Sequence, residues 1–321
     1  MYKRIVVTGS LAFDQIMSMP GRFADHILPD KIHILNVSFI MQTLRKEFGG
    51  TGGNIAYSLA LHKIPTLLVG VAGSDFETYE KHLKKLPALT RKISLFKKES
   101  CASGFAITDR DDNQIWGFYE GAMKYTSKLT LLKTLKRGDF LVLAPNDPKS
   151  MVKFAKEAEK LKIPFLFDPA FNIPHLSLTD LRFAIKKCAV LIGNDYEIEL
   201  ISKRLKMPKT KLVTAKQLLI TTLGARGSEI ISGGKSIKIA AAKPINASDP
   251  TGAGDAFRAG FLAGIIKDLP LEQCGRMGSV TAAYTVEKYG TQTHKFTPSE
   301  FKKRFDLNFQ KIQKKPTVSS K

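Results

Sequence analysis

A glycine-rich turn followed by an aspartate is the stretch of the sequence best suited to chemistry. Gly252, Ala253 and Gly254 precede a helical pattern, and Asp255 follows them directly. A helix that begins at glycines presents unpaired backbone N–H groups with no side chain to block an anion such as a phosphate. Those amides and the helix dipole would stabilise the charge that develops during phosphoryl transfer. A carboxylate at the next position can reach both the anion and an acceptor hydroxyl, as a general base must.

The same residues have a simpler structural explanation. Aspartate is favoured in the first turn of any helix, and glycine-rich turns are common. Taken alone, the Gly-x-Gly-Asp pattern fits an ordinary helix start as well as a catalytic loop. The choice between the two depends on the longer string at 246–262 and on the rest of the chain.

The elements that must position these residues alternate along the chain. Short apolar runs typical of buried strands are separated by segments with helical periodicity, which indicates a mostly parallel sheet covered by helices on both faces. Ligands of such sheets bind beyond the carboxyl ends of the strands. The expected strands are 5–8, 66–71, 140–143, 165–167, 190–192 and 217–221, and the expected helices are 54–63, 76–86, 150–161, 178–187 and 196–205.

Two stretches interrupt this alternation. Residues 12–47 contain a β-rich run at 32–39 with no convincing helix before it. Residues 101–120 contain β-rich runs at 103–108 and 114–119 around a polar turn, which predicts a hairpin. Together the two stretches predict a small antiparallel sheet attached to the α/β core, although edge strands of the main sheet would give the same pattern.

Composition limits the class of protein. The 321 residues are 43% hydrophobic and 25% charged, which excludes a disordered, collagenous or coiled-coil chain. A surplus of 50 Lys and Arg over 29 Asp and Glu gives a net charge of +21. That charge fits a nucleic-acid partner, an acidic membrane, a phosphorylated ligand or a merely basic protein. Three scattered cysteines, no signal-peptide core and no membrane-length apolar run predict a soluble cytoplasmic protein.

Four motifs, in order along the chain, resemble those of the ribokinase-like (PfkB) family of carbohydrate and nucleoside kinases. Residues 249–257, Asp-Pro-Thr-Gly-Ala-Gly-Asp-Ala-Phe, resemble the C-terminal signature of that family, and residues 48–56 resemble its N-terminal glycine signature. Residues 194–197 match its Asn-x-x-Glu motif, and residues 222–227 match its nucleotide-side glycine turn. The motifs span most of the chain.

The resemblance implies a fold and its division into parts. We expect a three-layer α/β/α core with a mostly parallel central sheet and a small antiparallel β lid. The core would comprise residues 1–11, 48–100 and 121–310, the lid residues 12–47 and 101–120, and a basic tail, expected to be disordered, residues 311–321.

On the acceptor side, the resemblance implies a ribose site. Asp14 follows the first strand and can accept hydrogen bonds from two ribose hydroxyls, and Asn54 can both donate to and accept from the same diol. The backbone at Gly49 and Gly50 would let the sugar approach closely, because no Cβ intervenes. An ordinary turn at the glycines and a plain helix cap at Asn54 are the alternatives.

Base recognition is implied at the hairpin. By resemblance to adenosine kinases, Phe105 and Phe118 would be the pair that stacks on a purine, with Ser10 and Ser38 offering polar contacts. From the sequence alone, such aromatic residues also fit packing within the lid or an interface.

On the donor side, the resemblance implies that ATP lies across the carboxyl edge of the sheet with its γ-phosphate on the 252–254 turn. Asn194 and Glu197 would position Mg²⁺ through water, although an ordinary helix cap with an acid in its first turn gives the same pattern. Asp249 resembles the monovalent-cation loop of the family, which would take K⁺. The remaining nucleotide contacts implied by the resemblance are Thr222, Gly224, Arg226 and Gly227.

Within the family, strings such as 7–14, 118–123 and 290–292 resemble bacterial adenosine kinases. The expected reaction is therefore ATP-dependent phosphorylation of the 5′-hydroxyl of a purine nucleoside, adenosine to AMP, with Asp255 as the base. A ribokinase-like sugar kinase is the alternative, and a non-catalytic nucleoside- or nucleic-acid-binding protein is a third interpretation. The resemblance also implies a homodimer formed through the lids, without a nucleic-acid or membrane partner.

One position departs from the pattern. Bacterial adenosine kinases carry an arginine a few residues after the Asp-Pro pair that corresponds to Asp168 and Pro169, directed at the phosphate site. This chain has His175 near that position. A neutral histidine would stabilise phosphate charge less well than an arginine, which is always protonated. A histidine on the surface of a loop is the alternative.

Overall fold

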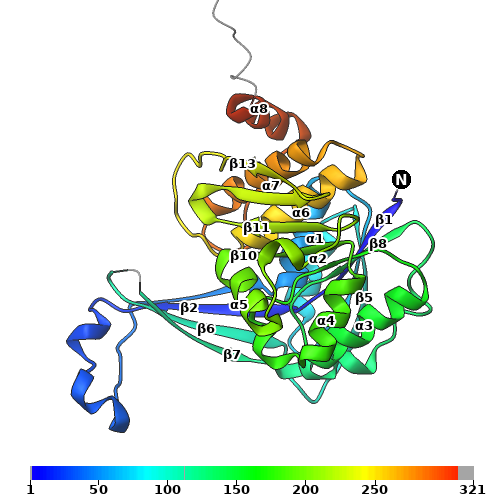
Figure 1. Cartoon of the computed structure of the whole chain (residues 1–321). Helices are drawn as coiled ribbons and strands as arrows, with labels where there is room; N and C mark the ends of the chain where they lie inside the picture. The colour runs from blue at the N-terminus through cyan, green and yellow to red at the C-terminus, as the bar shows by residue number, and fades with distance from the viewer. Residues whose placement is uncertain (1, 112, 310–321) are drawn as a thin grey trace, which may run out of the picture.

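The computed structural model of the chain describes residues 2–111 and 113–309. Within them, nine strands form a central sheet in the order β13-β12-β11-β10-β9-β8-β1-β4-β5. Neighbouring strands from β11 to β5 run parallel, whereas β11, β12 and β13 pair antiparallel at one edge. Helices lie on both faces of the sheet (Figure 1). The predicted three-layer α/β/α core with a mostly parallel sheet is confirmed.

All six expected strands and all five expected helices are present, with their ends shifted by a few residues. The strands of the central sheet are β1 (Arg4–Thr8), β4 (Thr66–Ala72), β5 (Leu89–Leu95), β8 (Asp139–Leu143), β9 (Phe165–Phe167), β10 (Val190–Asn194), β11 (Leu218–Thr222), β12 (Ser228–Ser232) and β13 (Lys235–Ile239). The helices are α1 (Thr51–Leu61), α2 (Glu77–Lys84), α3 (Pro148–Lys160), α4 (Leu178–Lys187), α5 (Asp195–Leu205), α6 (Ala253–Ile266), α7 (Leu271–Val286) and α8 (Pro298–Phe309).

The core fills both sides of the central sheet. In β1, Ile5 and Val7 belong to the apolar cluster that includes residues of α1, α6 and α7, whereas Val6 belongs to the cluster on the side of α3, α4 and α5. All three side chains are fully buried. A strand covered on both faces needs apolar residues at consecutive positions, which explains its uninterrupted hydrophobic run.

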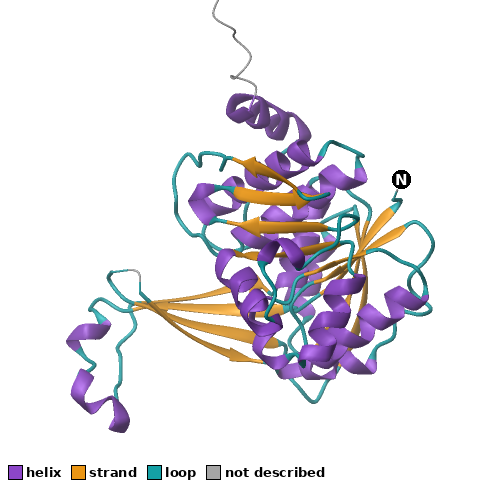
Figure 2. Ribbon diagram, viewed as in Figure 1, coloured by secondary structure: helices purple, strands orange, loops and turns teal. Residues whose placement is uncertain are grey.

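A second, four-stranded sheet projects from this core (Figure 2). It has the order β3-β2-β6-β7 and comprises β2 (Ala12–Ser18), β3 (Thr43–Gly49), β6 (Ala102–Thr108) and β7 (Gln114–Tyr119). The predicted hairpin is confirmed as the antiparallel pair of β6 and β7. We call this sheet the lid. It is a separate sheet, so the alternative of edge strands in the main sheet is wrong.

The lid differs from the expectation in one respect, because β2 and β6 pair in parallel. The lid is therefore a mixed sheet and not a wholly antiparallel one. Each outer pair, β2 with β3 and β6 with β7, is antiparallel: its first strand leaves the core and its second strand returns. The two first strands, β2 and β6, are neighbours and therefore run in the same direction.

The predicted β-rich run at 32–39 is not a strand. Two short 3-10 helices, Phe23–Asp25 and Pro29–Ile34, occupy the first part of the connection between β2 and β3, and the rest is irregular. This connection extends away from the body of the molecule (Figure 1). Ile32 and Ile34 are about two-thirds exposed there. Among the described residues no neighbouring strand pairs with the run, and strand-forming side chains alone do not make a strand.

Two further expectations concern membranes and the chain terminus. None of the helices within residues 2–111 and 113–309 is both long enough and apolar enough to cross a membrane. The basic tail at 311–321 lies outside the described residues.

Candidate active site

The carboxyl ends of the parallel strands bring predicted site residues, together with Asp168, to one edge of the sheet. Asp168 directly follows β9, Asn194 ends β10, and Asp255 lies in the first turn of α6. Asp14 lies in β2, at the base of the lid. Residues that are far apart in the sequence thus meet where ligands of open α/β sheets bind.

Asn54 and Asp255 are in direct contact. The Nδ2 of Asn54 donates to Asp255 Oδ2 at 2.9 Å, and both side chains are buried. The Oδ1 of Asn54 accepts from Gln292 Nε2 at 2.9 Å and lies 2.7 Å from the hydroxyl of Thr291. These contacts fix the orientation of the amide. Asn54 is not a helix cap, since Gly50 holds the cap position of α1.

The environment of Asp255 suits a base that works near neutral pH. The pKa of Asp255 is raised to about 7, chiefly by burial and in part by the charges of Asp168 and Asp14, while Arg258 and the hydrogen bond from Asn54 oppose that rise. A catalytic base is most effective when its pKa lies near the working pH. Asp255 can therefore hold a proton briefly and release it again.

The turn before Asp255 carries unpaired backbone amides. Gly252 caps α6 with φ of +77°, a left-handed conformation that favours glycine. The N–H of Ala253 is bonded to the carbonyl of Pro250 at 3.2 Å. In contrast, the N–H groups of Gly252, Gly254 and Asp255 donate no hydrogen bond within the described part of the chain. The anion site expected at 252–254 thus has three free donors, one of them from Asp255 itself.

An arginine that the sequence motifs did not indicate lies behind this turn. Arg258, on α6, is buried and forms an ion pair with Asp168, whose Oδ2 lies 2.5 Å from the arginine Nε. Its Nη2 donates to the other oxygen, Oδ1, at 2.9 Å. The signal was present, because Arg258 is a charged residue in a helix that is otherwise apolar after Asp255.

At the base of the lid, Asp14 lies against two glycines, Gly49 and Gly104. A Cβ at Gly49 would come within 2.1 Å of Asp14 Oδ2, and one at Gly104 within 2.9 Å of Oδ1, so a side chain at either position would displace the carboxylate. The pKa of Asp14 is raised to about 6, chiefly by burial and in part by the carboxylates of Asp249 and Glu47. The lid strands therefore place Asp14 on the face toward the site, and Glu47, which pairs directly with it, lies on the same face.

Ser10 and Gly50 shape the start of α1. The hydroxyl of Ser10 accepts from the N–H of Thr51 at 3.0 Å, and its carbonyl accepts from Gly52 at 3.1 Å. A Cβ at Gly50, where φ is +83°, would lie 2.6 Å from that carbonyl. Both side-chain and backbone groups of Ser10 thus hold the glycine turn in place.

Asn194 and Glu197 form a capping box at the start of α5. Asn194 Oδ1 accepts from the N–H of Glu197 at 2.8 Å, and Glu197 Oε2 accepts from the N–H of Asn194 at 2.7 Å. Burial and the nearby Asp168 raise the pKa of Glu197. Its Oε1 has no hydrogen bond among the described residues, so the carboxylate fits a water-mediated contact with Mg²⁺ as well as its capping role. Within the same residues, no cluster of three His, Cys, Asp or Glu side chains could hold a metal directly.

The nucleotide-side turn follows β11. Thr222 ends that strand, and its hydroxyl lies 3.5 Å from the carbonyl of Gly193. Gly224 and Gly227 have positive φ, and a Cβ at Gly227 would lie 2.0 Å from the carbonyl of Ile239. The Nη2 of Arg226 pairs with Asp195 Oδ2 at 2.6 Å on the surface. An exposed ion pair of this kind can open to admit a phosphate at little cost.

Asp249 is buried beside the glycine turn. Its Oδ1 accepts from the N–H of Thr251 at 2.9 Å, and its Oδ2 accepts from the N–H of Gly290 at 3.2 Å. In the described chain it forms no ion pair with a Lys or Arg side chain. A buried carboxylate held only by backbone donors fits the expected contact with a monovalent cation.

The structure does not bring Phe105 and Phe118 together. In the lid, Phe105 pairs with Gly117 and Phe118 pairs with Gly104, so the two rings lie on opposite faces of the sheet. Phe118 shares its face with Asp14, which pairs with Gly104. The two rings therefore cannot sandwich one base within a single chain.

Phe118 has a different aromatic neighbour. Phe171, which lies in a short 3-10 helix (Ala170–His175) after β9, has its ring centroid 6.1 Å from that of Phe118. Both rings are about half exposed. They therefore form a contact between the lid and the segment that follows β9.

Two other predicted residues lie away from this site. Ser38 is exposed in the projecting connection between β2 and β3, with no hydrogen bond to the site residues. His175 is exposed at the end of its 3-10 helix, as expected for a histidine on a loop surface.

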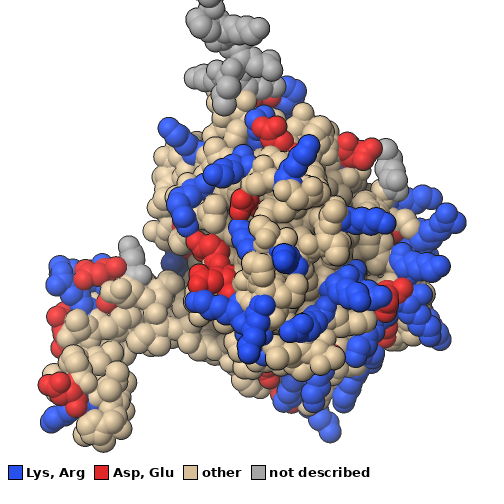
Figure 3. All heavy atoms as spheres, in the orientation of Figure 1, with Lys and Arg blue, Asp and Glu red and all other residues tan. Residues whose placement is uncertain are grey.

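The surplus of basic residues is concentrated outside the site. Lys and Arg side chains gather over the part of the surface formed by α3 and α4 (Figure 3). A shallow hollow of about 350 Å³ lies here. Its lining residues are Leu132, Lys149, Val152, Lys153, Lys156, Glu157 and Lys160.

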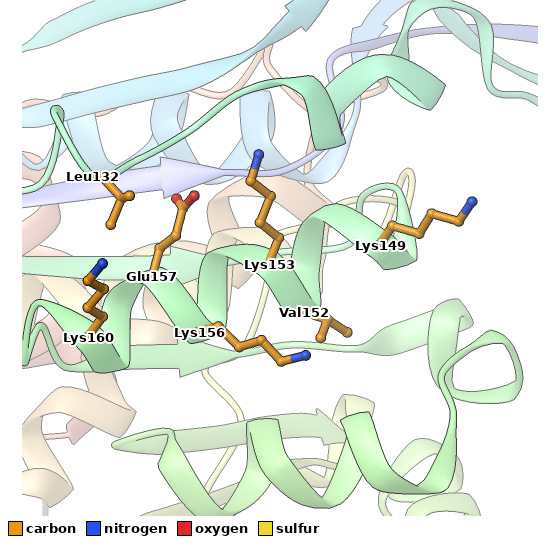
Figure 4. A pocket seen from close by; sticks show the side chains of 7 residues that line it. All are labelled: Leu132, Lys149, Val152, Lys153, Lys156, Glu157 and Lys160. Atoms are coloured by element: carbon orange, nitrogen blue, oxygen red, sulfur yellow. The ribbon is translucent and has the colours of Figure 1, made fainter.

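The lysines of this hollow do not form a binding site. Their side chains do not converge on a common point (Figure 4). The Nζ of Lys153 donates to the carbonyls of Ser127 and Leu129, and Glu157 accepts from the N–H of Leu131. These contacts attach α3 to the segment before β8, and we assign no ligand to the hollow.

Comparison with known proteins agrees with this geometry. The family model described as pfkB family carbohydrate kinase matches residues 10–298. A nucleoside kinase of Methanocaldococcus jannaschii is 31% identical over 294 residues, which cover 91% of this chain and 93% of that protein. A nucleoside kinase of Methanothermobacter thermautotrophicus is 32% identical over 305 residues, covering 94% of this chain and 95% of that protein. The structure of Burkholderia thailandensis nucleoside kinase in complex with inosine is similar with a TM-score of 0.87, at 31% identity and over 95% of this chain and 98% of that one.

Proposed function

The chain belongs to the pfkB family of carbohydrate kinases, and from this premise we propose that it transfers the γ-phosphoryl group of ATP to the 5′-hydroxyl of a purine nucleoside. The observation that carries the proposal is the contact between Asn54 and Asp255 beside the free amides of Gly252 and Gly254. A base and an anion site lie next to each other, as phosphoryl transfer requires. The similarity to a nucleoside kinase solved with inosine supports a purine nucleoside as the acceptor. We propose adenosine, with AMP as the product.

In the proposed reaction, Asp14 and the backbone of Gly49 hold the ribose. The 5′-oxygen attacks the γ-phosphorus in line, so that a new P–O bond forms while the bond to the bridging oxygen of ADP breaks. The hydroxyl proton passes to Asp255, whose pKa of about 7 suits this transfer. The amides of the glycine turn stabilise the charge on the transferring group, and closure of the lid excludes water.

We propose that two cations assist this arrangement. Glu197, through water, would hold Mg²⁺ with ATP, and Mg²⁺ would neutralise charge on the phosphate oxygens. Asp249 would contact K⁺. Because Asp249 also accepts from Gly290, and Thr291 contacts Asn54, an ion at Asp249 would stabilise the loop that orients Asn54.

For the base, we propose the aromatic surface where the lid meets the core. A purine held over the ribose would stack on Phe118, on the face of the lid that carries Asp14, and Phe171, whose ring lies against that of Phe118, would extend the same surface. Aromatic rings provide large flat contact surfaces for a base.

We also propose a homodimer through the lid. The lid face opposite Asp14 carries a row of apolar residues that pair directly across its four strands: Leu44, Met17, Ile107 and Ile115. Leu44 is 65% exposed and Ile115 is 47% exposed. An exposed apolar row on a sheet is a surface that a second copy of the chain would cover.

The reaction is tested by measuring ATP consumption with adenosine, inosine, guanosine, cytidine, ribose and fructose. The proposal requires turnover of purine nucleosides above that of the free sugars. Preference for ribose or fructose would instead identify a sugar kinase with the same base and anion site. Absence of turnover with every acceptor, together with salt-dependent retention on DNA, would identify a binding protein without kinase activity.

The assignment of the base is tested with Asp255→Asn. This variant should bind nucleoside as the wild type does but lose about 100- to 10,000-fold in turnover, because it removes an acid/base group. Nucleoside binding can be followed by fluorescence, since the single tryptophan, Trp116, lies on the lid with its ring near Gly104. Turnover close to that of the wild type would show that Asp255 is not the base.

A further inference from the structure

The ion pair of Arg258 and Asp168 has no part in the mechanism given above. The guanidinium is buried at the start of α6, and Asp168 is the most deeply buried carboxylate beside it, with 1% of its side chain exposed. An arginine has five N–H donors, and one carboxylate can accept from only two of them in a fork. The remaining donors of Arg258 need another acceptor.

The free end of Arg258 lies beneath the glycine turn. Side chains of a helix point toward its N-terminus, and Gly254 precedes Arg258 by one helical turn. A Cβ at Gly254 would lie 2.8 Å from Arg258 Nη1, so a side chain there would displace the guanidinium. The Nη1 donates no hydrogen bond within residues 2–111 and 113–309. It is therefore a free donor next to the free amides of the turn.

The charge of Arg258 acts on the acidic groups around the site. It lowers the pKa of Asp255 and that of Glu197, and it opposes the rise in the pKa of Asp168. The guanidinium thus lies among the proposed base, the proposed Mg²⁺ contact and its own buried partner. Phosphate oxygens placed between Gly254 and Glu197 would be within its electrostatic reach.

We propose that Arg258 is a catalytic residue that donates through Nη1 to the transferring phosphoryl group, and that Asp168 is the positioning residue that holds the guanidinium in place. This proposal rests on the proposed function, and it identifies Arg258 as the positively charged side chain that contacts the transferring phosphoryl group at the same site. It also accounts for the missing arginine after Asp168. His175 is exposed, so the positive charge comes from α6 instead of from the loop after β9.

The proposal is tested with Arg258→Gln and Arg258→Lys. An arginine directed at a transferring phosphoryl group contributes roughly 1,000-fold or more to turnover, so we expect Arg258→Gln to lose at least about 100-fold in kcat. The Kd for adenosine, measured by Trp116 fluorescence, should stay within about threefold of the wild type. Arg258→Lys keeps a positive charge but lacks the planar fork of the guanidinium, so its kcat should lie between that of the wild type and that of Arg258→Gln.

A second readout does not depend on turnover. In the presence of Mg²⁺ and adenosine, ADP with aluminium fluoride mimics the transferring phosphoryl group. Arg258→Gln should weaken the binding of ADP with aluminium fluoride at least tenfold more than it weakens the binding of ADP alone. Equal effects on the two would show that the arginine does not contact the transferring group.

The matched control is Arg304→Gln. Arg304 forms a comparable buried ion pair with Glu287, which follows α7, and among the described residues it donates only to Glu287 and to the carbonyl of Lys243, not to a proposed site residue. Its variant should lose stability as Arg258→Gln does while retaining kcat. If Arg258→Gln does not fold, it is combined with Asp168→Asn, so that two neutral amides replace the buried ion pair. The same measurements are then made on the double variant.

The outcomes separate the two proposals. A folded Arg258→Gln, or the folded double variant, that keeps kcat within threefold would overturn the role of Arg258 and leave the nucleoside kinase intact. Lack of nucleoside turnover by the wild type would overturn the proposed function itself. A loss of kcat matched by an equal loss in Arg304→Gln would show that Arg258 is only structural.

Discussion

At the scale of single residues, the site holds a carboxylate in an environment that favours its protonated form. Burial outweighs the attraction of Arg258 and the hydrogen bond from Asn54, so the pKa of Asp255 rises to about 7. A base must be ionised to accept a proton. We therefore expect kcat/KM to increase with pH through about 7 and to level off above it, with the ascending limb absent in Asp255→Asn.

The same shift has a consequence for stability. Because the pKa of Asp255 is higher in the folded protein than its ordinary value of 3.8, the fold gains a proton relative to the unfolded chain between about pH 4 and pH 7. Stability is therefore lost as the pH rises through that range. Asp255→Asn should be more stable than the wild type at pH 8, by at most about 4 kcal/mol, and nearly equal to it at pH 4. Thermal unfolding at the two pH values measures this, and a difference that is the same at both would contradict it.

The sequence located the residues whose roles depend on local pattern. Asp255 and Asn54 belong to motifs with a fixed spacing, and the structure brings them into contact. Arg258 was missed because its role depends on Asp168, 90 positions away, and on the space that Gly254 leaves. Such contacts form only in the folded chain. The sequence indicates them only indirectly, here by a charged residue in a largely apolar helix.

At the scale of elements, strand register decides what the lid can do. Periodicity predicted the hairpin of β6 and β7, but the pairing of Phe105 with Gly117 could not be read from the sequence. A shift of one residue moves a side chain to the other face of a sheet. The prediction of a β-rich run at 32–39 was wrong for a related reason, since a strand needs a partner and this segment has none in the described part of the chain.

Register leads to a prediction about the two phenylalanines. Phe118→Ala should raise the KM for a purine nucleoside roughly tenfold, since stacking of a base on an aromatic ring contributes about 1–3 kcal/mol. Phe105→Ala should change this KM less than about twofold, because its ring lies on the other face. Steady-state kinetics with adenosine and with inosine measure both. A larger effect of Phe105→Ala would mean that the base lies on the other face of the lid.

At the scale of the whole molecule, the net charge of +21 has little connection with the chemistry. The proposed site uses Asp14, Asn54 and Asp255, whereas the lysines gather over α3 and α4 (Figure 3). Basic surface can raise the rate at which ATP is encountered, but at physiological salt its range is only about 8 Å. The apolar row on the lid is a better guide to whether two copies of the chain associate than the net charge is.

That row gives the prediction for the whole molecule. If two lids pack through Leu44, Met17, Ile107 and Ile115, charges placed in the row would be buried without partners and would oppose association. The double substitution of Leu44→Glu and Ile115→Glu should convert a dimer to a monomer at micromolar concentration, as measured by light scattering during gel filtration. Leu307→Glu, on an exposed leucine of α8, adds a charge far from the lid and should leave the dimer intact. A wild-type chain that elutes as a monomer would refute the interface, and a double variant that stays dimeric would place it on another surface.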